Sequence, residues 1–366
     1  MDKNRVWLQK AQQLLEKSKG KKIILIGGAS SAGKTYKCKL LKQQLESIGK
    51  KCLIVSLDNF YRPISERIVQ QTLENFEQYK NNKLEITKIV QEITKKCLFD
   101  DKFSKQNCNK IAEKLKNIVN NSDIDRFIAE LKYCHKNINF DEPSAINFKE
   151  IAKQIFSKDY LTLPEYSFKT SEIVGHKVIS KNDYDYIIFE GIFALSPYLT
   201  NYINKNDVLT ISLKSDLITM LSRRLYRDIV VDRRTRSPKQ TFESFFEQVM
   251  PCYFKYIEPT LLHSNLNVNS VLTDEEILQK DYTNTYDSYN YQIIDKQCKN
   301  VKLYISCKND KPENLIFEYS SKNGKKNEIY NLKNLLEQDN ISKLLNYFKD
   351  TKYQVVKTKE KIEWNY

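Results

Sequence analysis

The chain has 366 residues and carries 60 lysines and arginines against 46 aspartates and glutamates, which gives a formal net charge of +14 at pH 7. Its 40% hydrophobic content excludes a chain that is disordered throughout and suffices for at least one buried core. No apolar run reaches the roughly 18 residues that cross a bilayer, and the lysine-rich start lacks the apolar centre of a secretory signal. We therefore expect a cytoplasmic protein without a membrane partner.

The positive charge would suit nucleic acid, a membrane surface or phosphorylated small molecules, and charge alone does not select among them. Glycine is more informative. The chain has only eight glycines, and three of them are Gly27, Gly28 and Gly33. Glycine concentrated in this way indicates a segment whose backbone must be free of side chains.

The first predicted strand, residues 22–26, is a short apolar run rich in β-branched side chains, which is typical of a buried parallel strand. Residues 28–35, GASSAGKT, then match the pattern GxxxxGK[ST] at every fixed position. The spacing of Leu41, Leu45 and Ile48 predicts a helix, and a glycine follows its end. Strand, loop and helix thus occur in the order that a phosphate-binding loop requires.

This loop predicts a binding site for ATP or GTP, because successive backbone N–H groups and the positive N-terminus of a helix surround nucleotide phosphates. Lys34 would reach the β- and γ-phosphates, and Thr35 would hold Mg²⁺ through its hydroxyl. The candidate nucleotide-binding residues of the loop are Gly28, Ser30, Ser31, Ala32, Gly33, Lys34 and Thr35.

Two acidic residues follow later predicted strands. The strand at 51–56 leads into Asp58, and the strand at 184–189 leads into Glu190. Open α/β sheets place their ligands beyond the carboxyl ends of the strands. At such a place Asp58 would accept the proton of an attacking hydroxyl, and Glu190 would coordinate Mg²⁺ directly or through water.

A fourth predicted strand, residues 208–213, precedes a helix that carries Arg223, Arg224 and Arg227, and an arginine-rich turn follows at 232–236. Arginines around a turn between two helices suit a lid that closes over a transferring phosphate. The alternative is a solvated basic face without chemistry.

Six motifs in chain order resemble the uridine–cytidine kinase and phosphoribulokinase family of phosphate-loop transferases. They occupy residues 28–35, 57–62, 139–145, 164–168, 189–192 and 223–228. The resemblance implies an α/β fold with a doubly wound, mostly parallel sheet. It also implies a kinase that uses ATP and Mg²⁺ to phosphorylate the 5′-hydroxyl of a ribonucleoside, uridine or cytidine first. The expected partner is a small molecule, a nucleoside or phosphorylated metabolite, rather than nucleic acid. Whether the protein forms a homo-oligomer is left open.

The same resemblance assigns roles to single residues. Asp58 would be the base that positions the hydroxyl, Asp141 and Arg224 would hold ribose hydroxyls, and Arg227 and Arg234 would contact phosphates. The implied acceptor-binding residues are Asp58, Tyr61, Asp141, Tyr166, Phe168 and Arg224, of which Tyr166 and Phe168 would line the base pocket. The candidate catalytic residues are Asp58, Lys34 and Arg227.

Two positions depart from the family pattern. Ser171 stands where uridine–cytidine kinases usually carry a base-reading histidine, and Asp232 stands where their lid usually has its first arginine. The identity of the acceptor therefore stays open. Two other functions remain candidates: a nucleotide or pyrophosphate hydrolase, in which water replaces the nucleoside, and a noncatalytic nucleotide-dependent binding module.

Residues 1–62 and 139–272 are predicted to form the phosphate-loop kinase domain. Between them, residues 63–138 contain no glycine and place apolar side chains at helical spacing, which predicts a helical insertion next to the acceptor site. The insertion would be a partner surface, a cover over the nucleoside, or an elaboration without chemistry.

Residues 273–366 form the third predicted part, an α+β region. It has strand-like runs at 301–306 and 314–319 and then a predicted helix. This order weakly resembles the first half of a CYTH-type triphosphate-tunnel domain, and a structural appendage without chemistry is the alternative.

Overall fold

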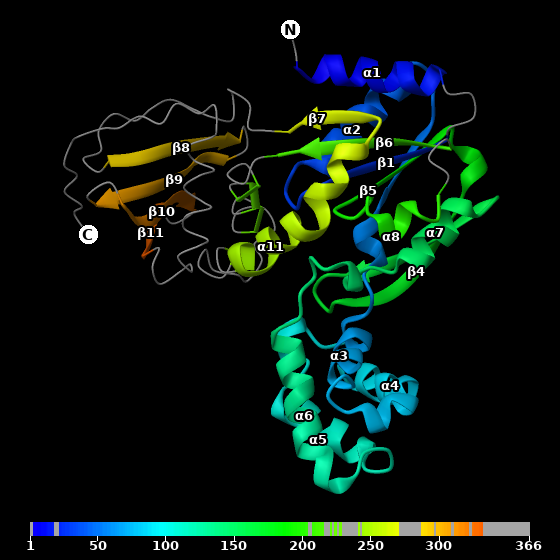
Figure 1. Cartoon of the computed structure of the whole chain (residues 1–366), viewed down its shortest axis with the longest axis vertical. Helices are drawn as coiled ribbons and strands as arrows, with labels where there is room; N and C mark the ends of the chain where they lie inside the picture. Colours follow the sequence, from blue (N-terminus) through cyan, green and yellow to red (C-terminus); the bar gives the residue numbers. More distant parts are fainter. Residues whose placement is uncertain are drawn as a thin grey trace. The chain divides into compact units, whose positions relative to one another are not determined.

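The computed structural model (Figure 1) describes most of the chain in two compact units. The described residues are 3–17, 22–203, 207–215, 220–221, 223–224, 227–228, 241, 244–270, 287–295, 298–308, 311–321 and 324–331. Unit 1 comprises Met1–Lys17, Leu25–Leu41 and Thr210–Tyr366, and unit 2 comprises Ser18–Ile24 and Lys42–Leu209. The predicted phosphate loop therefore belongs to unit 1, whereas Asp58, Glu190 and the predicted insertion belong to unit 2.

A five-stranded sheet has the strand order β2-β5-β1-β6-β7. Its strands are β1 (Ile23–Gly28), β2 (Cys52–Ser56), β5 (Tyr186–Gly191), β6 (Val208–Lys214) and β7 (Leu266–Asn269). β2 pairs with β5 in parallel, and β6 pairs with β7 in parallel. Because a tight turn cannot join parallel strands, crossover connections link them, and β1 lies between β5 and β6 in the sheet although it precedes both in the chain. The predicted α/β class with a mostly parallel sheet is confirmed.

The burial of these strands explains why four of them were visible in the sequence. All six residues of β1 are buried, as are Ile187–Gly191 of β5. A strand covered on both faces must be apolar throughout, and this produces the continuous runs. The sequence did not predict β7, because its four residues include only two apolar side chains and Val268 alone is buried.

The described helices of unit 1 cover apolar surface at helical spacing. Helix α1 (Lys3–Lys17) buries Trp7, Ala11 and Leu15 on one face and contacts β7. Helix α2 (Lys34–Glu46) starts at the end of the phosphate loop and buries Leu41 and Leu45. Farther along the chain, four short helical pieces follow one another: η7 (Phe245–Val249), α11 (Met250–Cys252), η8 (Tyr253–Ile257) and η9 (Glu258–His263). Of the helices that the structure describes, none is both long enough and apolar enough to span a membrane.

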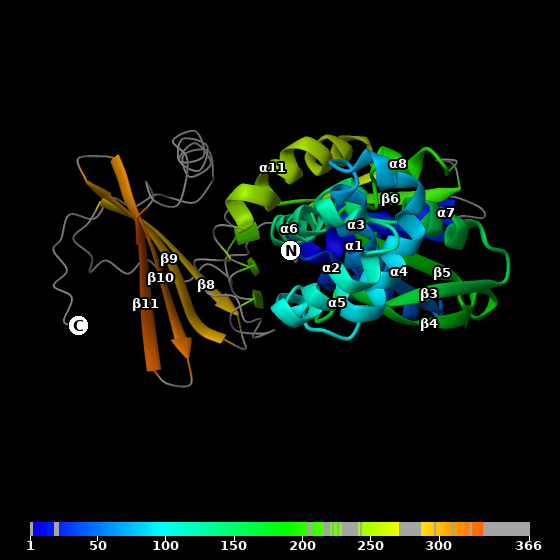
Figure 2. The same cartoon turned by 90° about the horizontal axis from the view of Figure 1, so that it is seen from below.

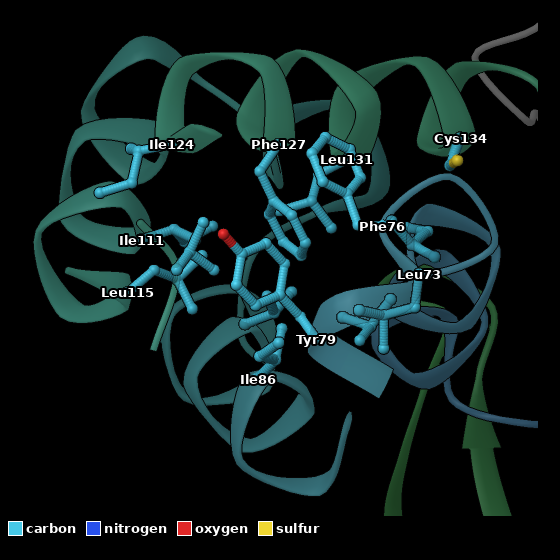
Figure 3. Packing of buried hydrophobic residues seen from close by; sticks show 14 of the residues in the cluster. Leu73, Phe76, Tyr79, Ile86, Ile111, Leu115, Ile124, Phe127, Leu131 and Cys134 are labelled. Carbon is cyan, nitrogen blue, oxygen red and sulfur yellow. The ribbon is translucent and has the colours of Figure 1, made fainter. Parts of the chain in front are cut away.

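The predicted insertion contains a helical core of its own. Its elements are α3 (Ile64–Thr72), η2 (Glu77–Asn82), α4 (Lys83–Thr94), η3 (Phe99–Asp101), α5 (Lys105–Leu115) and α6 (Asn121–Lys136). Figure 3 shows Phe127 and Tyr79 in the middle of this core. The ring centroid of Phe127 lies 5.0 Å from that of Phe76 and 6.3 Å from that of Tyr79. The helical spacing is thus borne out in the structure, while the boundaries at 63 and 138 stay a prediction.

Unit 2 also contains an antiparallel hairpin, β3 (Tyr160–Ser167) and β4 (Glu172–Ser180), which the sequence did not predict as strands. β3 buries Leu161, Leu163 and Tyr166. The hairpin follows η4 (Pro143–Ala145) and α7 (Phe148–Phe156), and η5 (Lys181–Asp183) leads from it to β5, which the short helix α8 (Pro197–Thr200) follows. It carries the predicted base-pocket residues on one strand and the turn after it.

A separate antiparallel sheet forms from the C-terminal part, in the order β11-β10-β9-β8. The strands are β8 (Asp287–Asp295), β9 (Cys298–Lys308), β10 (Lys311–Ser321) and β11 (Gly324–Asn331), and Figure 2 shows the last three side by side. The predicted strands at 301–306 and 314–319 fall within β9 and β10. The predicted helix after residue 331 lies outside the described residues, and the likeness to a CYTH-type domain stays a prediction.

Replacing Phe127 by alanine should destabilise the insertion, because the ring is fully buried and a cavity would remain. We expect the free energy of unfolding, measured by urea titration followed by circular dichroism, to fall by about 3–5 kcal/mol. Tyr133→Ala on the same helix is the matched control, since Tyr133 is 64% exposed. Equal losses from the two substitutions would contradict the placement of Phe127 in the core.

Candidate active site

The loop between β1 and α2 has the backbone shape that its sequence predicts. Ser31 has a φ of 62° and Gly33 a φ of 83°, so the chain passes twice through the left-handed region before α2 begins at Lys34. The Ala32 N–H donates to the Ala29 carbonyl at 3.1 Å and closes the turn. The Lys34 ammonium also donates to the Ala29 carbonyl, at 2.8 Å, and Lys34 is only 9% exposed. The loop thus holds a cation beside the positive N-terminus of a helix.

Both fixed glycines of this loop have a steric reason. A Cβ atom at Gly28 would lie 2.7 Å from the carbonyl oxygen of Leu213, which a side chain at that position cannot accommodate without moving β1 away from β6. A Cβ atom at Gly33 would lie 3.4 Å from Nη1 of Arg223, and the positive φ there disfavours any side chain. The glycines are therefore required by the packing of the loop as well as by its predicted phosphate contacts.

Residues from the C-terminal side of β6 contact the phosphate loop within unit 1. Nη1 of Arg224 donates to Oγ of Ser30 at 3.2 Å. The Ser270 hydroxyl donates to the Ala32 carbonyl at 2.5 Å, and Nη1 of Arg223 donates to the Ser270 carbonyl at 3.1 Å. The structure thus brings Arg224 to the loop itself, and Ser270, which the sequence did not single out, fixes the middle of the loop.

Asp228 connects the arginines of this segment. It is fully buried, and its Oδ1 accepts a hydrogen bond from Nε of Arg227 at 2.8 Å. Its Oδ2 forms an ion pair with Nε of Arg224 at 3.6 Å. A buried carboxylate between two guanidinium groups fixes the direction of both side chains. Arg234 and the predicted lid turn at 232–236 lie outside the described residues.

In unit 2, Asp58 and Glu190 lie at the carboxyl ends of neighbouring parallel strands. Asp58 is in η1 (Leu57–Phe60), directly after β2, and its N–H donates to the Ser56 hydroxyl at 3.3 Å. Ser56 is paired with Glu190 in the register of β2 and β5, and Glu190 is 4% exposed. The two acids thus occupy the sheet edge that the sequence assigned to them.

Four aromatic rings of unit 2 contact one another, and one of them belongs to Tyr61, three positions after Asp58. The ring centroid of Tyr61 lies 5.9 Å from that of Phe140 and 5.6 Å from that of Tyr166, and Phe168 lies 5.4 Å from Tyr166. Tyr61 and Tyr166 are each 8% exposed, whereas Phe168 is 54% exposed. We call Tyr61, Phe140, Tyr166 and Phe168 the aromatic cluster.

Carboxylates lie close to this cluster. Burial raises the pKa of Tyr61 well above its ordinary value, and the negative charges of Asp58 and Asp141 raise it further. The Tyr61 phenol therefore stays protonated at neutral pH. The structure thus brings together Asp58, Tyr61, Asp141, Tyr166 and Phe168, which are five of the six predicted acceptor-binding residues.

Arg67 of α3 joins this group, although the sequence analysis did not name it. It is 4% exposed, its Nη2 donates to the Asn139 carbonyl at 2.6 Å, and its guanidinium carbon lies 5.5 Å from the ring centroid of Phe140. The signal was present in the sequence, because Arg67 falls between Ile64 and Ile68 on the buried side of α3. A charged residue on an apolar stripe often marks a site.

A second group that the sequence did not reveal surrounds Glu172 at the start of β4. Its carboxylate has no exposed surface and accepts hydrogen bonds from the Ser65 N–H at 3.2 Å, the Ser65 hydroxyl at 3.2 Å and Nε2 of Gln91 at 3.3 Å. Nζ of Lys102 lies 3.4 Å away and is buried as well. Burial lowers the pKa of Lys102, and the charge of Glu172 opposes that shift. These contacts join the hairpin to the insertion.

The donor set fits Mg²⁺ held mainly by phosphates and water rather than by a protein cage. No group of three or more His, Cys, Asp or Glu side chains suited to a metal occurs in the described part of the chain. Thr35, at the first turn of α2, offers a hydroxyl, and Glu190 offers a carboxylate at the end of β5. One hydroxyl and one carboxylate are typical of magnesium at a nucleotide site. Because Thr35 and Glu190 belong to different units, their joint action stays a prediction.

A family model described as phosphoribulokinase / uridine kinase family matches residues 93–276, about half of the chain. The chain belongs to this family. The matched residues begin inside the predicted insertion and do not include the phosphate loop, whose pattern and geometry are therefore separate support. The resemblance inferred from the six motifs is confirmed.

Three known proteins show how far the likeness of this family member extends. Over 134 residues the chain is 31% identical to a uridine kinase of Ureaplasma urealyticum, a match that covers 36% of this chain and 62% of that protein. Over 248 residues it is 24% identical to uridine-cytidine kinase B of Dictyostelium discoideum, covering 67% of this chain and 72% of that protein. It is also 28% identical over 133 residues to inorganic pyrophosphatase TTM2 of Arabidopsis thaliana, covering 36% of this chain but only 19% of the plant protein.

Removing both partners of the buried pair should cost less than the two single removals added together. Glu172→Gln leaves the charge of Lys102 uncompensated, and Lys102→Met does the same to Glu172, so each single change should lower the free energy of unfolding by about 3–5 kcal/mol. The double variant should lose clearly less than the sum. Urea unfolding of all four proteins measures this double-mutant cycle.

The exposed pair Lys114–Glu92 is the matched control for that cycle, since its side chains are 46% and 66% exposed. Glu92→Gln should leave the unfolding midpoint unchanged. Strictly additive losses at Lys102 and Glu172 would contradict a direct interaction between them.

Proposed function

We propose that this family member is an ATP- and Mg²⁺-dependent kinase that transfers the γ-phosphate to the 5′-hydroxyl of a ribonucleoside, uridine or cytidine. The observation that carries the proposal is the group formed in unit 2 by Asp58, Asp141 and the aromatic cluster. Carboxylates accept hydrogen bonds from hydroxyl groups, and aromatic rings stack on a base. Both halves of a nucleoside thus have a suitable partner.

On the donor side, the phosphate loop would bind the nucleotide through its backbone N–H groups. Lys34 would neutralise the β- and γ-phosphates, and Arg227 and Arg234 would contact phosphate oxygens during transfer. Thr35 and Glu190 would hold Mg²⁺, which supplies positive charge to the β- and γ-phosphate oxygens. The support from unit 1 is the position of Lys34 over the loop and the fixed direction of Arg227.

On the acceptor side, Asp58 would accept the proton of the 5′-hydroxyl as its oxygen attacks the γ-phosphorus. The bond between that phosphorus and the oxygen bridging to the β-phosphate breaks, which yields ADP and a nucleoside monophosphate. Asp141 and Arg224 would hold ribose hydroxyls. For Arg224 the present contact is with Ser30 of the phosphate loop, so a ribose contact requires it to exchange or share that partner.

Asp58→Asn should lower the turnover number for nucleoside phosphorylation by about 10²–10⁴-fold, because the amide no longer accepts the hydroxyl proton. ATP binding should change by no more than a few-fold. Product mass and labelled ATP measure the transfer, and equilibrium binding measures the affinity. Asp183→Asn, an exposed acid in η5, is the control.

Turnover of the Asp58 variant at the wild-type rate would remove Asp58 from the mechanism. Phosphate release from ATP without any acceptor, unchanged by added nucleosides, would instead identify a hydrolase. Affinity for RNA that falls steeply with salt, without either reaction, would identify a binding module.

A further inference from the structure

Arg67 is a buried, positively charged residue of the insertion that lies next to predicted acceptor-binding residues. Its guanidinium group lies over the ring of Phe140, and Nη2 donates to the Asn139 carbonyl two positions before Asp141. Burial lowers the pKa of Arg67, and Tyr166, Glu142 and Tyr61 are the neighbours that counteract this. Two of these neighbours, Tyr61 and Tyr166, are side chains that the family resemblance assigns to nucleoside binding.

Nη1 of Arg67 is buried without a hydrogen-bond partner among the described residues. The Tyr166 hydroxyl is buried as well, and the side chain next to it is that of Ser171. Burial raises the pKa of Tyr166, whereas Ser171 lowers it by donating to the phenol and so leaves the O–H of Tyr166 as a donor. Leaving a buried donor unsatisfied costs free energy, and a charged donor costs more than a neutral one. An acceptor that reaches both atoms would recover this cost, and a carbonyl oxygen has the two lone pairs needed to do so.

We propose that Arg67 reads the base of the acceptor by donating from Nη1 to the keto oxygen at position 4 of a pyrimidine, to which the Tyr166 hydroxyl donates as well. This pair would replace the imidazole that is absent at Ser171. The inference rests on the proposed nucleoside kinase function and deepens it, because it selects among bases. Uracil presents a keto oxygen at position 4, whereas cytosine presents an amino group there, which is a donor and would face two donors. The acceptor is therefore uridine rather than cytidine.

The charges around Arg67 favour a neutral acceptor over an anionic one. Asp58 and Asp141 lie close to Tyr61, and Glu142 lies close to Arg67. A phosphate or carboxylate at Nη1 would be repelled by these acids, whereas a keto oxygen carries no net charge. The same carboxylates can accept hydrogen bonds from the ribose hydroxyls. The donors of Arg67 and Tyr166 therefore remain for the base.

The insertion fixes the parts of this arrangement. The Ile64 N–H donates to the Ser171 carbonyl at 2.9 Å, and the Phe99 N–H donates to the Lys169 carbonyl at 3.0 Å. Ser171 has a φ of 51°, so its turn is held in a conformation that few residues adopt alone. The helix that bears Arg67 and the hairpin that bears Tyr166 are therefore tied together, which keeps both donors in one place.

The test compares kcat/KM for uridine, cytidine and the pyrimidin-2-one riboside, which lacks the 4-oxygen. The wild-type protein should prefer uridine by about 10²-fold or more to cytidine and to the riboside that lacks this oxygen. Equal kcat/KM for uridine and cytidine would overturn the inference. Arg67→Met should reduce that preference at least tenfold through a loss for uridine, with little change for the pyrimidin-2-one riboside. Tyr166→Phe, which removes only the hydroxyl, should reduce it in the same direction.

Arg126→Met is the matched control, because Arg126 is an exposed arginine of the same insertion whose guanidinium carbon lies 5.2 Å from the ring of Phe76. It should keep the wild-type preference. Circular dichroism and ATP affinity establish that each variant is folded. If Arg67→Met does not fold, Tyr166→Phe and the wild-type comparison of the two ribosides decide the question.

An unchanged preference in folded Arg67→Met would overturn the inference, as would equal kcat/KM of the wild-type protein for uridine and the pyrimidin-2-one riboside. In both cases nucleosides are still phosphorylated, and the proposed function stands. If the wild-type protein phosphorylates none of the three nucleosides, the proposed function fails and this inference fails with it.

Discussion

The burial of Glu172 is the constraint that ties the hairpin to the inserted segment in unit 2. A carboxylate with no exposed surface is stable only if its hydrogen-bonding capacity is met, and here it is met by Ser65, Gln91 and Lys102, all from the inserted segment. Glu172 itself begins β4 of the hairpin. Separating the hairpin from the insertion would therefore leave the charge of Glu172 or of Lys102 without its partner. The insertion thus positions the residues of the hairpin, including Tyr166.

This constraint changes how the insertion is interpreted. A lineage-specific elaboration without chemistry would need only its own apolar core, which residues such as Phe76 and Phe127 provide. The residues that contact Glu172 are not part of that core, and Arg67 contacts Phe140, a ring of the aromatic cluster that packs against the core. They favour a segment that shapes the acceptor site over a segment that serves only as a partner surface.

The sequence predicted what depends on local signals. The pattern of the phosphate loop lies entirely within eight consecutive residues. Strands β1, β2, β5 and β6 can be recognised in the sequence because buried parallel strands are apolar along their length. The hairpin and β7 carry weaker patterns, since only some of their residues are buried. The pair of Lys102 and Glu172 could not be found in this way, because 70 positions separate the two residues and only the fold brings them together.

The proposed acceptor-binding residues were found partly by motif and partly only in the structure. Motif resemblance named Asp58, Tyr61, Asp141, Tyr166 and Phe168, and the structure places them together, but it could not name Arg67, which belongs to a segment that the motifs do not cover. The signal at Arg67 is physical rather than motif-based: a charge on the buried stripe of an amphipathic helix. Residues of this kind are where an inserted segment can alter recognition without altering the motifs.

Different contacts hold the phosphate loop and the turn at Ser171, and this matters for the interpretation of the serine at that position. Lys34, Ser30 and Ala32 are held by contacts within unit 1, from Ala29, Arg224 and Ser270. Ser171 is held by the insertion within unit 2. The family resemblance makes residue 171 a base-reading position, so its change to serine would act on the proposed acceptor recognition without disturbing these loop contacts. A serine hydroxyl is shorter than an imidazole, so under the proposed function a neighbouring element would supply the missing donor, and Arg67 is a buried donor that contacts the ring of Phe140.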